Sequence, residues 1–324
     1  MRAVVCREYG TPEDLVLEEL PDPTPGPGQV VVKVHAAAVN YPDVLLIDGK
    51  YQIKIPPPFS PGSEMAGEVL SVGDGVDFQP GDRVSATTFV GAFAEQAVVD
   101  ARGLARVPDG VDYADAAAFG VTNRTAYYTL RTVAPVKSGD WVVVLGAGGG
   151  VGLAAVDIAV LFGAKVIAAA SSAEKLEVCR QRGATEVIDY DAEDLKSRLK
   201  EITGEGGAQV VLDPVGGRYS EPALRSLGRG GKFITLGYAA GSIPAIPLNL
   251  VMLKGITVQG MEIRTFASDY PDQIARDDAE IAQLFAEGKL RPYIGARFPL
   301  EQTSTALRYI ADRKAIGKVV IDVA

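Results

Sequence analysis

Two kinds of hydrophobic pattern divide the chain. The first third carries short, valine-rich runs separated by proline and glycine turns. Short strands at close spacing with turn residues between them are typical of a small, mainly antiparallel barrel or sandwich. The expected strands are residues 29–34, 68–72, 82–86 and 94–99.

The pattern changes after about residue 112. Helical stretches are expected at 114–119 and 125–131, and from residue 141 apolar strands alternate with helices. Near-continuous apolar strands are typical of a parallel sheet covered by helices on both faces, so this section predicts a βαβ domain. The expected strands are 141–145, 165–170, 186–188, 209–212 and 232–236, and the expected helices are 151–162, 173–182, 193–202 and 218–226.

Near residue 260 the pattern alters again. Helices are expected at 270–288 and 303–312, and they flank short apolar runs at 296–298 and 318–323. The last run needs a sheet begun elsewhere, and the N-terminal β region is its natural host. We therefore expect a β-rich part interrupted by a nucleotide-binding domain.

Composition and charge narrow the function classes. The 324 residues carry 32 Lys and Arg against 41 Asp and Glu, a net charge of −9, which disfavours nucleic acid or an anionic membrane as the main partner. Cys6 and Cys179 form no Cys-x-x-Cys pair and His35 is the single histidine, so a zinc site built on these ligands and a histidine triad are excluded. The N-terminus resembles no export signal and no apolar run is long enough for a membrane span, so we expect a cytoplasmic protein.

A glycine turn provides the first candidate for chemistry. The predicted strand 141–145 leads directly into Gly146-Ala-Gly-Gly-Gly-Val-Gly152 and then into a predicted helix. A helix N-terminus attracts negative charge, and glycines let a dinucleotide pyrophosphate approach the backbone. The spacing fits Gly146-x-x-Gly149-x-x-Gly152 better than the more common Gly-x-Gly-x-x-Gly. In this strand, turn and helix context the pattern predicts a dinucleotide site.

The end of the next predicted strand indicates which dinucleotide. NAD-binding units place an acidic residue there for the ribose 2′-hydroxyl, whereas this chain has Ser171 and Ser172, followed by Lys175. Small hydroxyl residues and a lysine would suit a 2′-phosphate. We therefore expect NADPH as the cofactor.

The chain resembles the zinc-free quinone oxidoreductase, or zeta-crystallin-like, branch of the medium-chain dehydrogenase/reductase superfamily, and most closely its quinone oxidoreductase-like protein 2 group. The matching stretches are 25–32, 38–43, 61–67, 80–84, 146–152, 166–175, 213–217, 223–227 and 317–320. The resemblance implies an α/β protein with a GroES-like β-rich catalytic domain at 1–122 and 264–324, and a doubly wound Rossmann NADP-binding domain at 123–263. It also implies a homodimer, for which the aliphatic stretch from Ile243 to Leu253 is the expected interface.

The zinc-dependent relatives place a cysteine where this chain has Asn40 and a histidine where it has Ser63. Without these ligands we expect no metal, so alcohol oxidation with zinc as Lewis acid is disfavoured. Reduction of an activated acceptor, a quinone or an enone, is expected instead, with hydride from NADPH.

The resemblance also implies the site residues. Asn40 and Asp43 are expected in the catalytic cleft beside the nicotinamide, and Tyr51 falls where the branch has an active-site tyrosine. Asn40 is thus expected both in catalysis and in cofactor binding. The remaining residues expected to bind the cofactor are Thr125, Gly149, Gly150, Val151, Gly152, Ser171, Lys175, Tyr190, Gly237, Tyr238, Arg313 and Lys318.

Three functions remain open from the sequence. The first is an NADPH-dependent quinone reductase, in which orientation of an already electrophilic acceptor does most of the work. The second is an enone or enoyl-CoA reductase in which the phenol of Tyr51 protonates the enolate. The third is a non-enzymatic NADPH-binding protein with a structural or RNA-binding role. The segment Gly260-Met-Glu-Ile-Arg264 departs from the aromatic residues expected there and leaves the substrate open.

Overall fold

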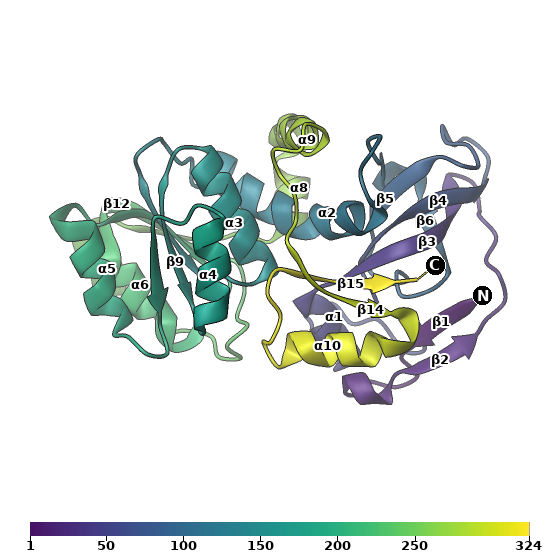
Figure 1. The fold of residues 1–324 in the computed structure, drawn as a ribbon, viewed down its shortest axis with the longest axis horizontal. Helices are drawn as coiled ribbons and strands as arrows, with labels where there is room; N and C mark the ends of the chain where they lie inside the picture. The colour runs from purple at the N-terminus through teal and green to yellow at the C-terminus, as the bar shows by residue number, and fades with distance from the viewer. Residues whose placement is uncertain (324) are drawn as a thin grey trace. The chain divides into compact units, whose positions relative to one another are not determined.

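The computed structural model describes residues 1–323 (Figure 1). The chain divides into two compact units, the first comprising Met1–Val121 and Arg291–Ala324, and the second Thr122–Leu290. Among the described residues, no helix is both long and apolar enough to cross a bilayer.

The first unit is built on a seven-stranded mixed sheet with the order β14-β15-β3-β4-β5-β7, in which β6 also pairs with β3. A two-stranded β1-β2 sheet accompanies it. The strands are β1 (Arg2–Val5), β2 (Val16–Glu19), β3 (Gln29–Val39), β4 (Glu64–Val72), β5 (Arg83–Thr87), β6 (Gln96–Asp100), β7 (Leu104–Arg106), β14 (Ile294–Pro299) and β15 (Lys318–Asp322). The helices are α1 (Tyr41–Ile47), α10 (Thr303–Ala311) and the first part of α2 (Tyr113–Tyr128).

The C-terminal strand completes this sheet, as its sequence predicts. Strand β15 pairs antiparallel with β3, with Val319 opposite Val39 and Ile321 opposite Ala37. The side chains of β15 are almost fully buried because the strand lies inside the sheet rather than at its edge. This pairing brings Lys318, at the start of β15, next to the end of β3.

The second unit is a doubly wound parallel sheet with the order β10-β9-β8-β11-β12-β13. Helices α3 and α4 cover one face and α5 and α6 the other (Figure 1), as right-handed crossovers require when the strand order reverses after β10. The strands are β8 (Trp141–Leu145), β9 (Lys165–Ala170), β10 (Glu186–Asp189), β11 (Ala208–Asp213), β12 (Leu227–Thr235) and β13 (Thr257–Gly260). The helices are α3 (Gly150–Leu161), α4 (Ala173–Gln181), α5 (Leu195–Thr203), α6 (Ser220–Ser226), α7 (Leu248–Lys254), α8 (Ile263–Asp269) and α9 (Pro271–Ala286).

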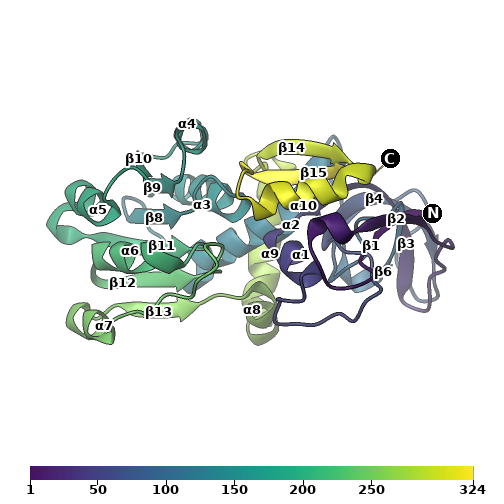
Figure 2. The same cartoon turned by 90° about the horizontal axis from the view of Figure 1, so that it is seen from below.

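Strand β13 forms one edge of the parallel sheet, beside β12 (Figure 2). The strands β8, β9 and β10 and the helices α3 and α4 lie within a residue or two of their predicted bounds. The near-continuous apolar runs of β8 and β9 are buried, with Val143 and Ile167 fully inaccessible. The fold class expected from the sequence is confirmed.

The observed extent of helix α2 differs from the prediction. The two helices expected at 114–119 and 125–131 are one continuous helix that ends in a π turn at Thr129–Val133. Gly120 is not a break between helices. A Cβ atom added at Gly120 would lie 2.8 Å from Glu64 Oε1 and 3.0 Å from Thr87 Oγ1, so glycine is needed there for close packing.

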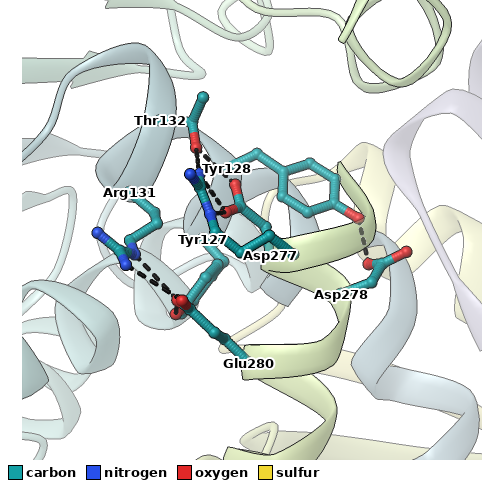
Figure 3. Close-up of polar contacts among 8 residues, drawn as sticks. Tyr127, Tyr128, Arg131, Thr132, Asp277, Asp278 and Glu280 are labelled. Atoms are coloured by element: carbon teal, nitrogen blue, oxygen red, sulfur yellow. Dashed lines mark hydrogen bonds and ion pairs between the residues drawn. The ribbon is translucent and has the colours of Figure 1, made fainter. Parts of the chain in front are cut away.

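The segment 264–290, expected with the GroES-like domain, packs in the second unit. Helix α9 is joined to the end of α2 and to the π turn by polar side chains (Figure 3). The hydroxyl of Thr132 donates to the buried Asp277 at 2.6 Å, and the Tyr127 hydroxyl donates to Glu280 at 2.7 Å. Arg131 also pairs with Glu280 at 2.9 Å. These contacts are long-range, so the local hydrophobic pattern does not contain them.

Candidate functional site

The candidate cofactor residues of the second unit follow the carboxyl ends of adjacent parallel strands. Tyr190 follows β10, Ser171 follows β9, and the glycine turn follows β8. Further along the same edge, Asp213 ends β11, and Gly237 lies just beyond β12. In a doubly wound sheet this edge carries the ligand, at the point where the strand order reverses. That point lies between β8 and β11.

The glycine turn is shaped by close approach of its own backbone. Gly146 has a φ of 59°, and Gly149 is the N-cap of α3, with its N–H donating to the Gly146 carbonyl at 3.0 Å. A Cβ atom at Gly152 would lie 2.2 Å from the Gly146 carbonyl oxygen. The third glycine therefore lets α3 begin directly against the turn. Gly149, Gly150 and Val151 are half-buried at the helix N-terminus, which suits an anion.

Lys175 lies against this turn. A Cβ atom at Gly148 would lie 2.6 Å from the Lys175 Cβ, so the lysine stem crosses directly over the glycine. Helix α4 is capped by Ser172, whose hydroxyl accepts from the Lys175 N–H at 3.4 Å. The side chains of Ser171 and Lys175 are half-buried. The geometry brings a lysine, two serine hydroxyls and a helix N-terminus to one part of the sheet edge, a combination that suits phosphate groups.

A buried carboxylate shapes the loop after β11. Asp213 Oδ1 accepts from the N–H groups of Val215 at 2.9 Å and Gly216 at 2.7 Å, while its other oxygen accepts from Ser220. Burial raises the pKa of Asp213, and these hydrogen bonds oppose the shift. The loop packs against the glycine turn, because a Cβ atom at Gly146 would lie 2.7 Å from the Val215 side chain. Asp213 was not among the residues predicted from the sequence, although its place at the end of a predicted strand marks it as a candidate.

The other candidates of the second unit differ in exposure. Tyr190 is half-buried, and its ring lies 4.2 Å from that of Tyr219. Tyr238 is exposed and lies next to Gly216, where an added Cβ atom would be 2.9 Å from the tyrosine ring. Gly237 packs beside the Pro214 carbonyl, and Thr125 is buried in α2.

In the first unit, Asn40 belongs to a buried polar cluster, which also contains Glu64 and Lys318. The Lys318 ammonium donates to Asn40 Oδ1 at 2.6 Å and to Glu64 Oε2 at 2.8 Å. Asn40 Nδ2 donates to Glu64 Oε2 at 2.8 Å and to Ser63 Oγ at 3.3 Å. The side chains of Lys318 and Glu64 are 3% and 1% exposed. The ends of β3, β4 and β15 bring these groups together.

Asp43 lies beside this cluster as the third residue of α1. Its Oδ2 accepts from the Asn40 N–H at 2.7 Å, and Asn40 is the N-cap of the helix. Complete burial raises the pKa of Asp43 to about 7, against the opposing effects of the Asn40 N–H, the Ser63 hydroxyl and the Lys318 ammonium. The Asp43 carboxyl thus accepts a hydrogen bond at the start of α1 and titrates near neutral pH.

Two candidates of the first unit lie outside the polar cluster. Tyr51 is half-buried in the bend after α1, where its N–H donates to the Leu45 carbonyl at 3.1 Å. Arg313 is exposed after α10 with a φ of 59°, a conformation in which its N–H closes the helix on the Ile310 carbonyl. The structure therefore gives Arg313 a role in helix termination.

The residues at Asn40, Ser63 and Lys318 do not fit a zinc ion. An amide and a hydroxyl are poor zinc ligands, and the Lys318 ammonium already occupies the position between Asn40 and Glu64. Residues 1–323 contain no group of three or more His, Cys, Asp or Glu side chains arranged to hold a metal.

Two family models match the chain. The model described as alcohol dehydrogenase GroES-like domain matches residues 26–109, and the model described as zinc-binding dehydrogenase matches residues 150–277. A GroES-like unit and a Rossmann unit together define the class as a two-domain nucleotide-dependent oxidoreductase.

Named relatives define the family more closely. The quinone oxidoreductase-like protein 2 homolog of Nematostella vectensis is 38% identical, over 99% of this chain and 88% of the relative. Human quinone oxidoreductase is 34% identical, over 99% and 97% of the two chains. The crystal structure of Escherichia coli quinone oxidoreductase complexed with NADPH has a TM-score of 0.92 and 29% identity, over 100% of both chains. The chain belongs to the quinone oxidoreductase family of the medium-chain dehydrogenase/reductase superfamily.

Replacement of Gly152 by alanine should destabilise the folded protein at the glycine turn. The new Cβ atom would overlap the Gly146 carbonyl oxygen, and relief requires α3 to move away from β8. We expect a loss of about 2 kcal/mol in the free energy of unfolding, measured by urea denaturation. Gly206→Ala is the matched control, because nothing lies within 4 Å of its Cβ position. Equal stability of the two variants would contradict the packing role of Gly152.

The buried carboxyl of Asp43 should make stability depend on pH. Its pKa is about 7 in the folded protein and near 3.8 in the unfolded chain, so its contribution to stability decreases as pH rises from about 4 to 7. Asn in its place cannot ionise but can still accept the Asn40 N–H. From pH 5 to pH 8, we expect Asp43→Asn to gain about 2–3 kcal/mol relative to the wild type, by urea denaturation. Parallel pH profiles would refute the raised pKa.

Proposed function

We propose that the protein is an NADPH-dependent reductase that transfers hydride to a quinone. The observation that carries the proposal is the line of anion-binding features along one sheet edge, from the glycine turn to Lys175, in a chain 34% identical to human quinone oxidoreductase. NADPH, when bound, supplies the hydride. The fit of the site to NADPH is supported by the missing acid after β9 and by the NADPH complex of the Escherichia coli enzyme.

The polypeptide's own contribution is binding and orientation. The N-terminus of α3 and Lys175 bind the phosphates, and Ser171 and Tyr190 complete the 2′-phosphate end. Asn40 and Lys318 supply the polar groups of the catalytic end, and Thr125, Gly237 and Tyr238 lie along the cofactor. Because a quinone is already electrophilic, orientation and a fixed electrostatic environment suffice for hydride transfer. We propose that the reaction uses no metal, because Lys318 holds the place between Asn40 and Glu64.

The direct test is NADPH consumption with a panel of acceptors. A simple quinone, an aliphatic enone and a short enoyl-CoA are compared, each with NADPH and with NADH, after dialysis against a chelator. We expect the quinone to be reduced fastest, with NADPH preferred, and the chelator to have no effect. A protein that binds NADPH but reduces none of the three would contradict the proposed function.

Lys175→Ala tests the cofactor preference. Loss of the ammonium removes a charge-assisted contact that only the 2′-phosphate receives, so NADPH affinity should fall by about 1–3 kcal/mol while NADH affinity changes little. Titration of nucleotide fluorescence measures both. Arg180→Ala is the matched control, since Arg180 is an exposed cation on the same helix, paired with Glu177. Equal losses for the two cofactors would reject a 2′-phosphate contact.

A second candidate function is reduction of an enone or enoyl-CoA with Tyr51 as proton donor. It is favoured by the position of Tyr51, which is half-buried just beyond the short helix that Asn40 caps. Tyr51→Phe should then slow enone reduction at least tenfold, because an enolate needs a proton, and change quinone reduction less. Steady-state rates of Tyr51→Phe and the wild type with a quinone and an enone test whether Tyr51 is the proton donor. An unchanged enone rate would exclude Tyr51 as the acid.

We also propose a homodimer that forms through the edge of the parallel sheet. Strand β13 is an edge strand, and the neighbouring segment exposes four large apolar side chains to 65% or more. They are Ile243, Leu248, Met252 and Leu253. A second copy would cover this surface and extend the sheet.

Light scattering at micromolar concentration tests this assembly. We expect a dimer for the wild type and a monomer for Leu248→Asp, which puts a charge into the apolar surface. Val16→Asp, at an exposed apolar residue of the other unit, should leave the dimer intact. A monomeric wild type would refute the proposal. The cytoplasmic location stays a prediction from the sequence.

A further inference from the structure

The amide of Asn40 is fully engaged by its protein neighbours. Its Nδ2 group has two hydrogens, which go to Glu64 and Ser63, and its Oδ1 accepts from Lys318. The carboxylate on one side and the ammonium on the other allow only this orientation of the amide. Asn40 therefore connects two charges inside the unit.

Glu64 supplies the negative charge in this cluster. Lys318 is 3% exposed, and a buried ammonium is retained only when an anion and hydrogen-bond acceptors surround it. The other carboxyl that faces this cluster is Asp43, whose pKa of about 7 leaves it largely protonated below neutral pH. The remaining polar groups are neutral. While Asp43 is protonated, the charge on Lys318 therefore depends on Glu64.

The second oxygen of Glu64 is also held. Glu64 Oε1 accepts from the backbone N–H of Val121 in α2. The same oxygen lies where a side chain on Gly120 would collide with it. Because both oxygens have fixed partners, the carboxylate cannot turn away from Lys318. The cluster thus joins α2, β4 and β15 with the residue that caps α1.

We propose that Glu64 is a positioning residue, which keeps the Lys318 ammonium charged and the Asn40 amide in one orientation at the catalytic end of the site. The inference rests on the proposed reduction of a quinone. Hydride addition leaves negative charge on a quinone oxygen, and a fixed, preorganised positive charge nearby stabilises it without reorganisation. In this chain an ion pair provides that charge.

Glu64→Gln tests the inference because it removes the charge and keeps the shape. Without the carboxylate, Lys318 should lose its proton as pH rises, so the kcat/KM for a quinone relative to a reference protein should fall at least tenfold between pH 6 and pH 9. In this and the stability measurement, Glu64→Gln and its reference protein both carry Asp43→Asn, because Asp43 interacts with Glu64 and Lys318 and would otherwise titrate in the same pH range. The effect should lie mainly in kcat, since the cofactor phosphates bind in the other unit.

Thermal stability as a function of pH tests the role of Glu64 without an activity measurement. In Glu64→Gln the folded protein would release the Lys318 proton at a pH where the unfolded chain keeps it. Thermal stability relative to the reference protein should therefore increase with pH while relative activity decreases. General damage to the fold would lower both together. Asp157→Asn, which removes the half-buried ion pair with Arg182, should show neither trend.

A double variant covers the case in which Glu64→Gln does not fold. Glu64→Gln with Lys318→Met removes both charges, so it should fold, with a quinone kcat lowered on the order of 10- to 100-fold at every pH. A wild-type kcat in this variant would overturn the inference, as would a pH-independent activity ratio in Glu64→Gln. A wild type that reduces no quinone would overturn the proposed function, whereas the stability trend would still report on the role of Glu64.

Discussion

The ion pair between Lys318 and Glu64 organises the buried polar cluster of the first unit. Two buried charges cost desolvation energy that only close pairing and further hydrogen bonds offset. The pair meets that requirement with Asn40 and the Val121 N–H as additional partners. Its geometry requires β15, from the C-terminal end of the chain, to lie beside β3. The pair therefore couples the register of the sheet to the positions of Asn40 and Lys318.

The second unit depends on a different constraint, the parallel direction of its strands. Parallel strands need crossover helices, so their carboxyl ends all meet at one edge. Residues far apart in the sequence, from Gly146 to Gly237, are brought to this edge by the strand order. Asp213 and the small residues at Gly148 and Gly152 then set the local distances. Backbone N–H groups and one lysine suit this edge to an anion, although the net charge of the chain is −9.

Local pattern predicted some elements closely and others poorly. The strands Trp141–Leu145 and Lys165–Ala170 match their predicted bounds, because buried parallel strands are continuous apolar runs. The two helices predicted at 114–119 and 125–131 are one helix, in which the missing side chain of Gly120 allows the close approach of Glu64. The family resemblance implied that the segment 264–290 belongs to the other domain, but it packs in the second unit through polar contacts such as Thr132 with Asp277, which leave no periodic signal.

The sequence by itself determined the fold class and the glycine turn and predicted a preference for NADPH, because each depends on residues that are close together in the chain. It also indicated Asn40, Asp43 and Lys318 through the family resemblance. Only the tertiary structure decided that Asn40 and Lys318 share one carboxylate, and that this carboxylate is Glu64. The three residues come from β4, β15 and the end of β3, and only the pairing of those strands brings their side chains together. Burial then decides which of the charges must be paired, and no local pattern contains that information.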